Sequence, residues 1–413
     1  MTVLTTALAV NGDRLNQHID QLAELGRLPH GGIRRLAFSP EDCQARQRVR
    51  QWMEQAGMKV RVDAAGNMIG RYAGQQPKLA AIATGSHIDT VPAGGRYDGV
   101  LGVLAGIEAV QSLHEQGLRL DHPLDVIVFS DEESSMIGSR AIAGAVKGEA
   151  IYHPEQGTSI QACLDAVGGD WSRILSARRS REDMAAFVEL HVEQGSVLDS
   201  KGYEIGVVDG VVGMNRYAIT ITGVPNHAGT TPMDMRHDAL VAAAQVTLAV
   251  QAIALEQPSR PVATVGSLNV SPNAANIVPG RVELTVDMRD LSQDCLDDMT
   301  YQLSRHLRAI AAKTRTDIDM TPILKVKPSP AAASIKSVIR EVCQDLGFSA
   351  HALPSRAGHD AMEMGHITDM GMIFVPSHAG ISHSDQEYTS PEQCTQGATV
   401  LLHTLVRLDQ VYS

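Results

Sequence analysis

The first third of the chain alternates between short apolar runs and longer segments in which apolar residues recur with helical spacing. Residues 79–84 and 124–130 are apolar runs of strand length, which predict buried strands. Residues 16–25, 39–56 and 99–113 carry helical spacing instead. Because strand and helix patterns alternate, we predict an α/β domain built on a mostly parallel sheet.

A different pattern begins near residue 213. Its strands and helices follow the order β-α-β-β-α-β, which is that of a ferredoxin-like α+β unit. The segments are strands at 216–222, 262–270, 281–288 and 316–326 and helices at 236–255 and 291–313. Pro328 and Pro330 mark its exit, after which helix and strand patterns resume. We therefore predict a catalytic domain that is split in sequence by an inserted domain, with the parts at 1–212, 213–328 and 329–413.

Composition and charge narrow the class of protein. The chain has 413 residues, 44% of them hydrophobic and 20% charged, with a net charge of −12. That charge disfavours a nucleic-acid partner, which needs clustered Lys and Arg. The first ten residues lack the basic start of a secretory signal, and no apolar run reaches the roughly 20 residues of a membrane span. Five scattered cysteines indicate reduced thiols, so we expect a cytoplasmic enzyme or binder of small molecules that does not contact a membrane.

Candidate metal ligands follow the first predicted strand of the sheet. His87 and Asp89 lie two positions apart directly after it, so Asp89 could orient His87 towards a metal ion. A hydrogen-bonded polar pair in a turn is the structural alternative. Asp98 lies in GGRYDGVLG, before a predicted helix, where its carboxylate could bridge two metal ions or cap the helix.

More candidates follow the second apolar run and the later strands. Asp131, Glu132 and Glu133 are consecutive acids, which are costly at a buried sheet edge unless cations compensate them. One glutamate could bind a metal while its neighbour activates water, and a solvated charged surface is the alternative. His191, in FVELHVEQG, and His383, in GISHSDQE, also lie on or after predicted strands. Because functional groups gather beyond the carboxyl ends of parallel strands, these placements together favour a metal site.

Other catalytic motifs are absent from the sequence. It has no G-x-S-x-G turn of a serine hydrolase, no H-E-x-x-H helix of a zinc peptidase and no G-x-G-x-x-G dinucleotide loop. The remaining groups are imidazoles and carboxylates, which suit zinc or manganese.

Five segments together resemble those of the peptidase M20 family of binuclear metallohydrolases. In chain order they are GSHIDTVPAGGRYDG, SDEESS, ELHVEQG, NHAGTTPM and GISHS. The resemblance covers essentially the whole chain, including the predicted insertion. NHAGTTPM, AGHDA and GISHS narrow it to the branch that holds N-carbamoyl-L-amino acid hydrolases, allantoate amidohydrolases and β-ureidopropionases.

The resemblance implies a role for each candidate near the metal. One ion would be bound by His87 and His191, a second by Glu133 and His383, and Asp98 would bridge the two. Asp89 resembles the residue that orients His87. Glu132 resembles the general base that takes a proton from the attacking water.

The resemblance also assigns substrate contacts and a dimer. The inserted domain would serve as a lid and dimerisation domain, with His227 of NHAG reaching the active site of the partner subunit and stabilising the oxyanion. Asn276 and Arg289 match positions that hold the substrate carboxylate, and Gly358 of AGHDA matches a position whose backbone approaches the substrate. Two departures from the family pattern, at Met214 and Arg356, lie in regions expected to touch substrate.

The sequence therefore favours a homodimeric hydrolase with two divalent ions per subunit, acting on an N-carbamoyl-L-amino acid. Allantoate, a larger diureido acid, is the rival substrate. An aminoacylase or dipeptidase of the wider family is less compatible with NHAGTTPM and GISHS. A binding protein that has kept the fold but lost catalysis is disfavoured because Glu132 is retained, and a pure binder needs no base.

Overall fold

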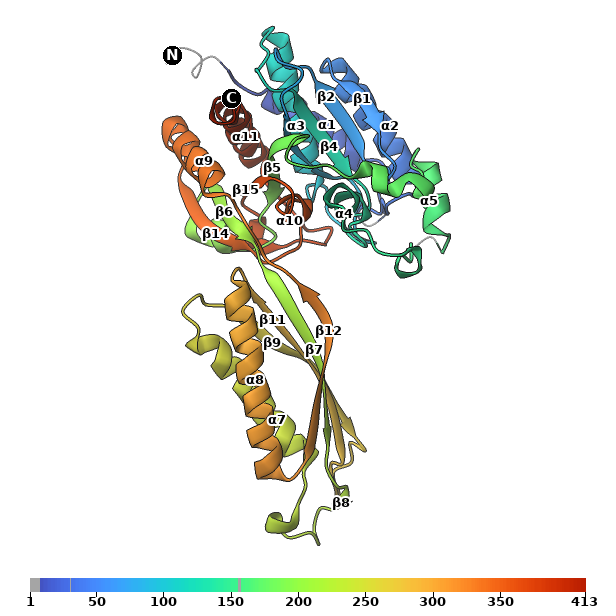
Figure 1. Ribbon diagram of the computed structural model, residues 1–413, viewed down its shortest axis with the longest axis vertical. Helices are drawn as coiled ribbons and strands as arrows, with labels where there is room; N and C mark the ends of the chain where they lie inside the picture. Colours follow the sequence, from blue (N-terminus) through green and yellow to red (C-terminus); the bar gives the residue numbers. More distant parts are fainter. Residues whose placement is uncertain (1–7, 30, 155–156) are drawn as a thin grey trace. The chain divides into compact units, whose positions relative to one another are not determined.

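The computed structural model describes residues 8–29, 31–154 and 157–413. The chain forms two compact units (Figure 1). Unit 1 comprises Met1–Val211 and Pro330–Ser413, and unit 2 comprises Val212–Ser329. These boundaries lie one residue outside the predicted insertion, 213–328, at each end.

Unit 1 is built on a nine-stranded sheet whose main path runs β1-β2-β4-β3-β5-β15-β6-β13, with β14 paired to β6. The strands are β1 (Lys59–Val62), β2 (Met68–Tyr72), β3 (Ala81–His87), β4 (Leu124–Phe129), β5 (Met184–Val192), β6 (Ile205–Val211), β13 (Ser329–Pro330), β14 (Ala350–Ser355) and β15 (Asp369–Val375). The four central strands, β4, β3, β5 and β15, pair in parallel. The predicted α/β fold with a mostly parallel sheet is therefore confirmed.

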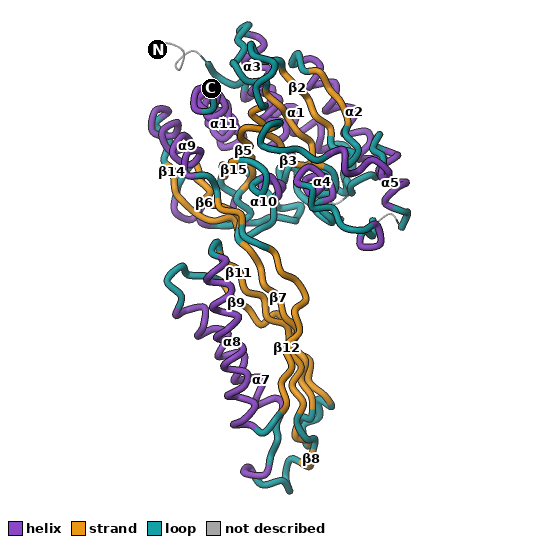
Figure 2. The backbone as a smooth tube through the Cα atoms, viewed as in Figure 1, coloured by secondary structure: helices purple, strands orange, loops and turns teal. Residues whose placement is uncertain are grey.

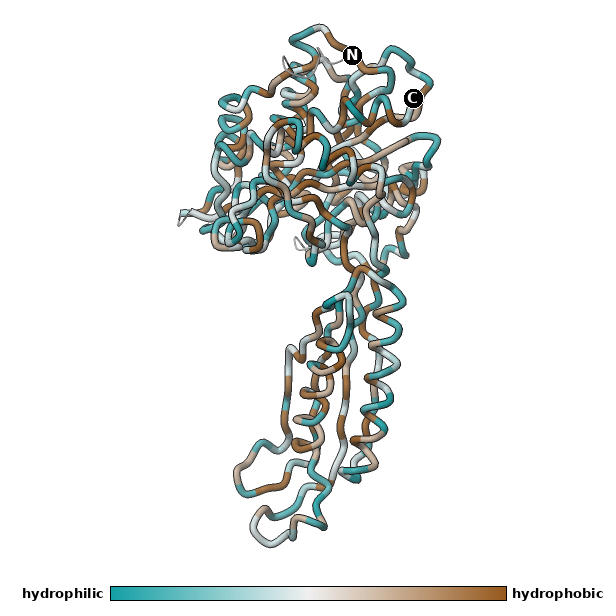
Figure 3. Tube along the Cα trace, turned by 90° about the vertical axis from the view of Figure 1, so that its left-hand side faces the viewer, coloured by the Kyte–Doolittle hydropathy of each residue, from teal (hydrophilic) through white to brown (hydrophobic). Residues whose placement is uncertain are grey.

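Helices cover both faces of this sheet. They are α1 (Gly12–Ala23), α2 (Pro40–Gln55), α3 (Val100–Glu115), α4 (Ile137–Ala143), α5 (Ile160–Ala166), α6 (Val197–Lys201), α9 (Ala333–Leu346), α10 (Asp360–Met364) and α11 (Pro391–Val411). The main core joins α1, α2, α3, α9 and α11 to alternate strand residues such as Val188 and Leu190. Figure 3 shows hydrophobic segments, coloured brown, running through the middle of unit 1. Because side chains alternate along a strand, the neighbours Glu189 and His191 of β5 point to the opposite face.

Capping residues explain where several helices begin. Helix α1 begins at Gly12, earlier than the predicted 16–25, because Asn11 accepts a hydrogen bond from the backbone N–H of Arg14. Helix α11 begins with a capping box between Ser390 and Gln393. Sequence patterning had not indicated this C-terminal helix, although it supplies much of the core.

Unit 2 is a four-stranded antiparallel sheet in the order β12-β7-β11-β9 with two helices along one face, as Figure 2 shows. Its main elements are β7 (Gly213–Thr222), α7 (Ala239–Glu256), β9 (Val262–Ser271), β11 (Arg281–Asp290), α8 (Gln293–Thr314) and β12 (Asp317–Val326). A short pair, β8 (Asn226–His227) and β10 (Ile277–Val278), is separate from this sheet. The chain order and strand order are those of a ferredoxin-like unit.

Helix α7 is long and apolar enough, by composition alone, to cross a membrane. Its residues Ala242, Val246 and Val250 pack instead into the core of unit 2, between the helix and the sheet. The apolar residues Leu248 and Leu255 remain exposed. We therefore regard α7 as a core helix with an apolar outer surface.

Candidate active site

The five expected metal ligands come together at the carboxyl ends of the parallel strands. His87 is the last residue of β3, and His191 is the penultimate residue of β5. Glu133 follows β4, and His383 lies in the segment between β15 and α11. Polar groups at the ends of neighbouring parallel strands necessarily share one edge of the sheet, which is why residues distant in sequence meet here.

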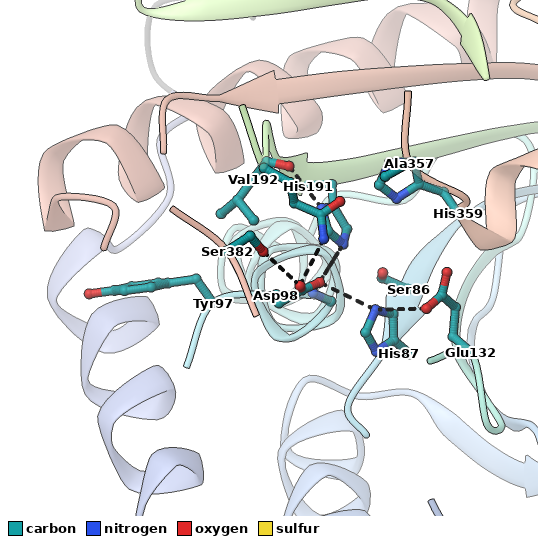
Figure 4. Close-up of polar contacts among 12 residues, drawn as sticks. Ser86, His87, Tyr97, Asp98, Glu132, His191, Val192, Ala357, His359 and Ser382 are labelled. Carbon is teal, nitrogen blue, oxygen red and sulfur yellow. Dashed lines mark hydrogen bonds and ion pairs between the residues drawn. The ribbon is translucent and has the colours of Figure 1, made fainter. Parts of the chain in front are cut away.

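Asp98 lies at the centre of this cluster (Figure 4). Its Oδ1 is 3.1 Å from Nε2 of His191 and 3.6 Å from Nε2 of His87. Its Oδ2 is 3.3 Å from Nε2 of His383, which is in turn 3.5 Å from Oε2 of Glu133. The two carboxylate oxygens of Asp98 thus face two different sets of ligand atoms.

The arrangement gives two groups of three ligand atoms that share Asp98. Within each group the ligand atoms lie within 4.8 Å of one another. The groups are His87–Asp98–His191 and Asp98–Glu133–His383. Imidazole nitrogens and carboxylate oxygens are the donors that zinc and manganese accept, so these residues fit divalent cations.

The alternative role of Asp98 as a helix cap does not hold. The N-cap residue of α3 is Gly99, and no side chain caps that helix. Gly99 has φ = 65°, and a Cβ there would lie 2.5 Å from Cε1 of His87. A glycine is therefore required between Asp98 and the helix, because a larger residue would displace His87.

Backbone carbonyls orient both buried histidines. Nδ1 of His87 donates to the carbonyl of Asp89 at 3.0 Å, and Nδ1 of His191 donates to the carbonyl of Val192 at 2.9 Å. Because a carbonyl only accepts, Nδ1 carries a proton in each ring, and Nε2 is the atom that faces Asp98 and is available to a metal ion.

The carboxylate of Asp89 does not make the expected hydrogen bond to His87. Its nearer oxygen is 3.8 Å from Nδ1 of His87, and the other accepts the N–H of Glu133 at 3.3 Å. The orienting contact to His87 is therefore made by the carbonyl of Asp89, while its carboxylate fixes the start of the glutamate segment.

The site concentrates buried charge. Burial raises the pKa of Glu132 well above its ordinary value and that of Glu133 to about 7. Burial alone would lower the pKa of His87, but Glu132, Asp98 and the other acids raise it well above the ordinary range. Burial alone would raise the pKa of Asp98, but hydrogen bonds from the three histidines hold this pKa well below its ordinary value. A divalent cation would compensate these carboxylates directly.

A cavity of about 230 Å³ opens over these residues. Glu132 lines it, with its Oε2 3.6 Å from Nε2 of His87. Gly358, in the loop before α10, also lines it, and a Cβ there would meet nothing within 4 Å. The backbone around Gly358 is therefore open towards this cavity.

Gln194 lines the same cavity and was not identified from the sequence. Its Nε2 donates to Oδ2 of Asp98 at 2.8 Å, and its Oε1 is buried without a hydrogen-bond partner among the described residues. The only signal was its position three residues after His191 within ELHVEQG. An amide that contacts the carboxylate of Asp98 and has a spare acceptor is suited to receive an N–H from a bound molecule.

The three substrate residues expected in unit 2 occupy two separate places. The carbonyl of Asn276 accepts from the N–H of Ala228, next to His227, at 2.9 Å, so Asn276 and His227 lie together by β8 and β10. Arg289 lies at the other end of β11, opposite Met214, where the chain enters unit 2. Figure 1 shows β8 at one end of the four-stranded sheet.

Comparisons with known proteins agree with this geometry. Residues 83–407 match the family model described as peptidase family M20/M25/M40. The chain is 39% identical to an N-carbamoyl-L-amino acid amidohydrolase of Geobacillus stearothermophilus, over 97% of this chain and 99% of that relative. It is 36% identical to a ureidoglycolate hydrolase of Arabidopsis thaliana, over 98% and 88%, and 34% identical to an allantoate amidohydrolase of Bacillus subtilis, over 95% and 97%. A crystal structure of an amidase of the hydantoinase/carbamoylase family from Burkholderia multivorans superimposes with a TM-score of 0.89 at 35% identity, covering 97% of this chain and 98% of that one.

An α/β sheet that gathers His, Asp and Glu ligands at its carboxyl edge defines a metal-dependent hydrolase, here one acting on amide C–N bonds. The chain belongs to the peptidase family M20/M25/M40.

Proposed function

We propose that the protein hydrolyses the ureido C–N bond of an N-carbamoyl-L-amino acid and releases ammonia, carbon dioxide and the amino acid. Two divalent ions per subunit, zinc or manganese, would be held by the two groups around Asp98. The observation that carries the proposal is that one carboxylate presents an oxygen to each group. When bound, such a pair of ions lowers the pKa of a water molecule and polarises a carbonyl.

The chain's own residues would then bind substrate and move protons. Glu132 lines the cavity beside His87, where its carboxylate can take a proton from the attacking water and deliver it to the departing nitrogen. Gly358 and Gln194 border the same cavity, and their polar groups can orient the ureido group. Asp89 fixes the glutamate segment through the N–H of Glu133.

Arg289 is proposed to hold the substrate carboxylate. Its Nε donates to Asp287 at 2.8 Å, and the same carboxylate accepts from Arg216 at 2.7 Å. The carboxylate of Asp287 thus holds the two guanidinium groups side by side. A guanidinium held in this way is suited to bind a planar carboxylate.

The separation of Arg289 from His227 and Asn276 supports a shared site in a homodimer. Arg289 lies eight positions along β11 from Arg281, which is about 27 Å at the rise of a strand. Asn276 and His227 lie beyond Arg281, so one small substrate cannot touch all three residues of a single subunit. A second subunit that supplies His227 and Asn276 would resolve this. The open edge strand β9 and the exposed Leu248 and Leu255 of α7 offer surface for the contact.

Mixing two inactive variants tests the shared site. His227→Ala and Glu132→Gln subunits are each expected to be inactive alone. In a mixed dimer, the intact metal site of the first meets the intact His227 of the second. Random mixing of equal amounts should restore about one quarter of wild-type activity, whereas no recovery after verified subunit exchange would rule out a site shared across subunits.

Allantoate is the second candidate substrate, because a relative of similar length is an allantoate amidohydrolase. An ammonia-release assay on metal-reconstituted protein distinguishes the candidates. Its panel should contain N-carbamoyl-L-amino acids, N-carbamoyl-β-alanine, ureidoglycolate, allantoate and one dipeptide. Preference for an N-carbamoyl-L-amino acid supports the proposal, and preference for allantoate or the dipeptide would replace it.

We place the enzyme in the cytoplasm, consistent with five cysteines that form no disulfide.

A further inference from the structure

The segment that carries His383 has no regular secondary structure. Residues 381–390 lie between the 3-10 turn His378–Gly380 and α11. His383 has φ = 53°, and its side chain is 51% exposed. Neither strand pairing nor burial therefore fixes His383, so side-chain contacts around it must hold it near Asp98.

Glu387 makes the contacts that join this segment to Asp98. Its side chain is buried, and Oε1 accepts the N–H groups of Tyr97 at 2.8 Å and of Asp98 at 3.2 Å. The hydroxyl of Ser382, the neighbour of His383, donates to Oδ2 of Asp98 at 3.1 Å. Oε2 of Glu387 lies 3.5 Å from the same hydroxyl. One carboxylate thus joins the backbone of the shared ligand to the turn that carries His383.

The fit around Glu387 is tight. A Cβ at Gly95 would lie 2.4 Å from Cδ and 2.5 Å from Cβ of Glu387. The added Cβ would clash with both ends of the glutamate side chain, so rotation of the carboxylate alone would not relieve the clash. Glycine at position 95 therefore leaves the space that Glu387 occupies.

We propose that Glu387 is a positioning residue that sets the geometry of the Asp98–Glu133–His383 group and thereby its affinity for the second divalent ion. It does not touch the ion or the substrate. The His87–Asp98–His191 group depends on it less, because its two histidines lie in strands and are oriented by backbone carbonyls. The inference rests on the proposed two-ion site.

The test is a titration of metal-free full-length protein with Mn²⁺, measuring both dissociation constants by calorimetry and ion content after gel filtration. Glu387→Ala removes the contacts, and Glu387→Gln keeps an oxygen that can accept the two N–H groups. Gly95→Ala displaces Glu387 without altering its chemistry. Asp409→Asn is the matched control, because Asp409 is also a buried carboxylate that accepts two consecutive N–H groups, those of Asp121 and His122, away from the metal site.

We expect Glu387→Ala to weaken binding of the second ion by about 10–100-fold and to leave the first ion unchanged. Glu387→Gln should recover part of that loss, and saturating Mn²⁺ should restore the kcat of both variants. If Glu387→Ala does not fold, Gly95→Ala should give the same selective loss. Asp409→Asn should bind both ions as wild type does.

Two results overturn the inference while leaving the two-ion site intact. They are wild-type affinity for the second ion in both Glu387→Ala and Gly95→Ala, and equal weakening of both ions, which would indicate a general loss of structure. Binding of only one ion by wild type would instead contradict the two-ion site itself and the inference with it.

Discussion

His87 and His191 are 2% and 1% exposed and lie within strands, whereas the side chain of His383 is 51% exposed and lies in a segment without regular structure. The two halves of the site share Asp98 but are positioned by different means. The register of the sheet positions the histidines of the first half, and side-chain hydrogen bonds position His383 in the second half. We therefore expect the first half to bind its ion tightly and the second half to exchange its ion more readily.

The largest expected effect is that of metal removal. Chelation should abolish ammonia release, because the proposed ions lower the pKa of the attacking water and polarise the scissile carbonyl. The ion of the Glu133–His383 half should leave first, so activity should disappear while about one ion per subunit remains. Ion content and activity measured on the same chelated samples would show this order. Simultaneous loss of both ions would remove the contrast between the halves.

Substitutions at the neighbouring Glu132 and Glu133 should affect catalysis and metal binding separately. Glu132→Gln should keep both ions and lower kcat by about 10²–10⁴-fold, because general-base catalysis is lost. Glu133→Gln is its matched control and should lose the second ion selectively. Metal analysis beside steady-state kinetics tests both variants. Near wild-type kcat in Glu132→Gln would contradict the assigned base.

The two halves should also differ in their contribution to stability. In metal-free protein, His191→Ala should lower the free energy of unfolding by about 2–3 kcal/mol, because it leaves a cavity and removes buried hydrogen bonds. His383→Ala should cost less than about 0.5 kcal/mol, since its side chain is half exposed. Denaturant unfolding of the two variants provides the comparison, and equal losses would show that burial does not distinguish them.

Arg289 lies outside both halves and should therefore leave both ions in place. Arg289→Ala should lower kcat/KM by about 10–100-fold, chiefly through a higher KM, because a charged hydrogen bond to the substrate carboxylate is lost. Arg281→Ala is a suitable control at the other end of the same strand. An unchanged KM for every carboxylate substrate would exclude Arg289 from substrate binding.

The sequence predicted the elements whose patterns are strong. The apolar runs of β3 and β4 identified buried strands, and their polar ends located His87 and Glu133. The C-terminal helix α11 was not predicted, and neither was β14, whose residues Ala350–Ser355 include Pro354 and have weak strand propensity.

The parts of the site that escaped prediction depend on distant contacts. Glu387 meets the backbone of Tyr97 across 290 positions, and no local motif marks such a pair. Gln194 was not predicted from the sequence, because no spacing rule marks an amide near a candidate ligand histidine. The clustering of Asn276 with His227, away from Arg289, required the register of β11 and could not be read from order along the chain.

We propose that two ions around Asp98 act together on a ureido acid. The most direct test of this proposal is to add Mn²⁺ stepwise to metal-free protein and measure ammonia release from an N-carbamoyl-L-amino acid at each equivalent. We expect little activity up to the first equivalent per subunit and a steep rise between the first and the second. Full activity at one equivalent, or no ammonia from this substrate at any metal loading, would contradict it.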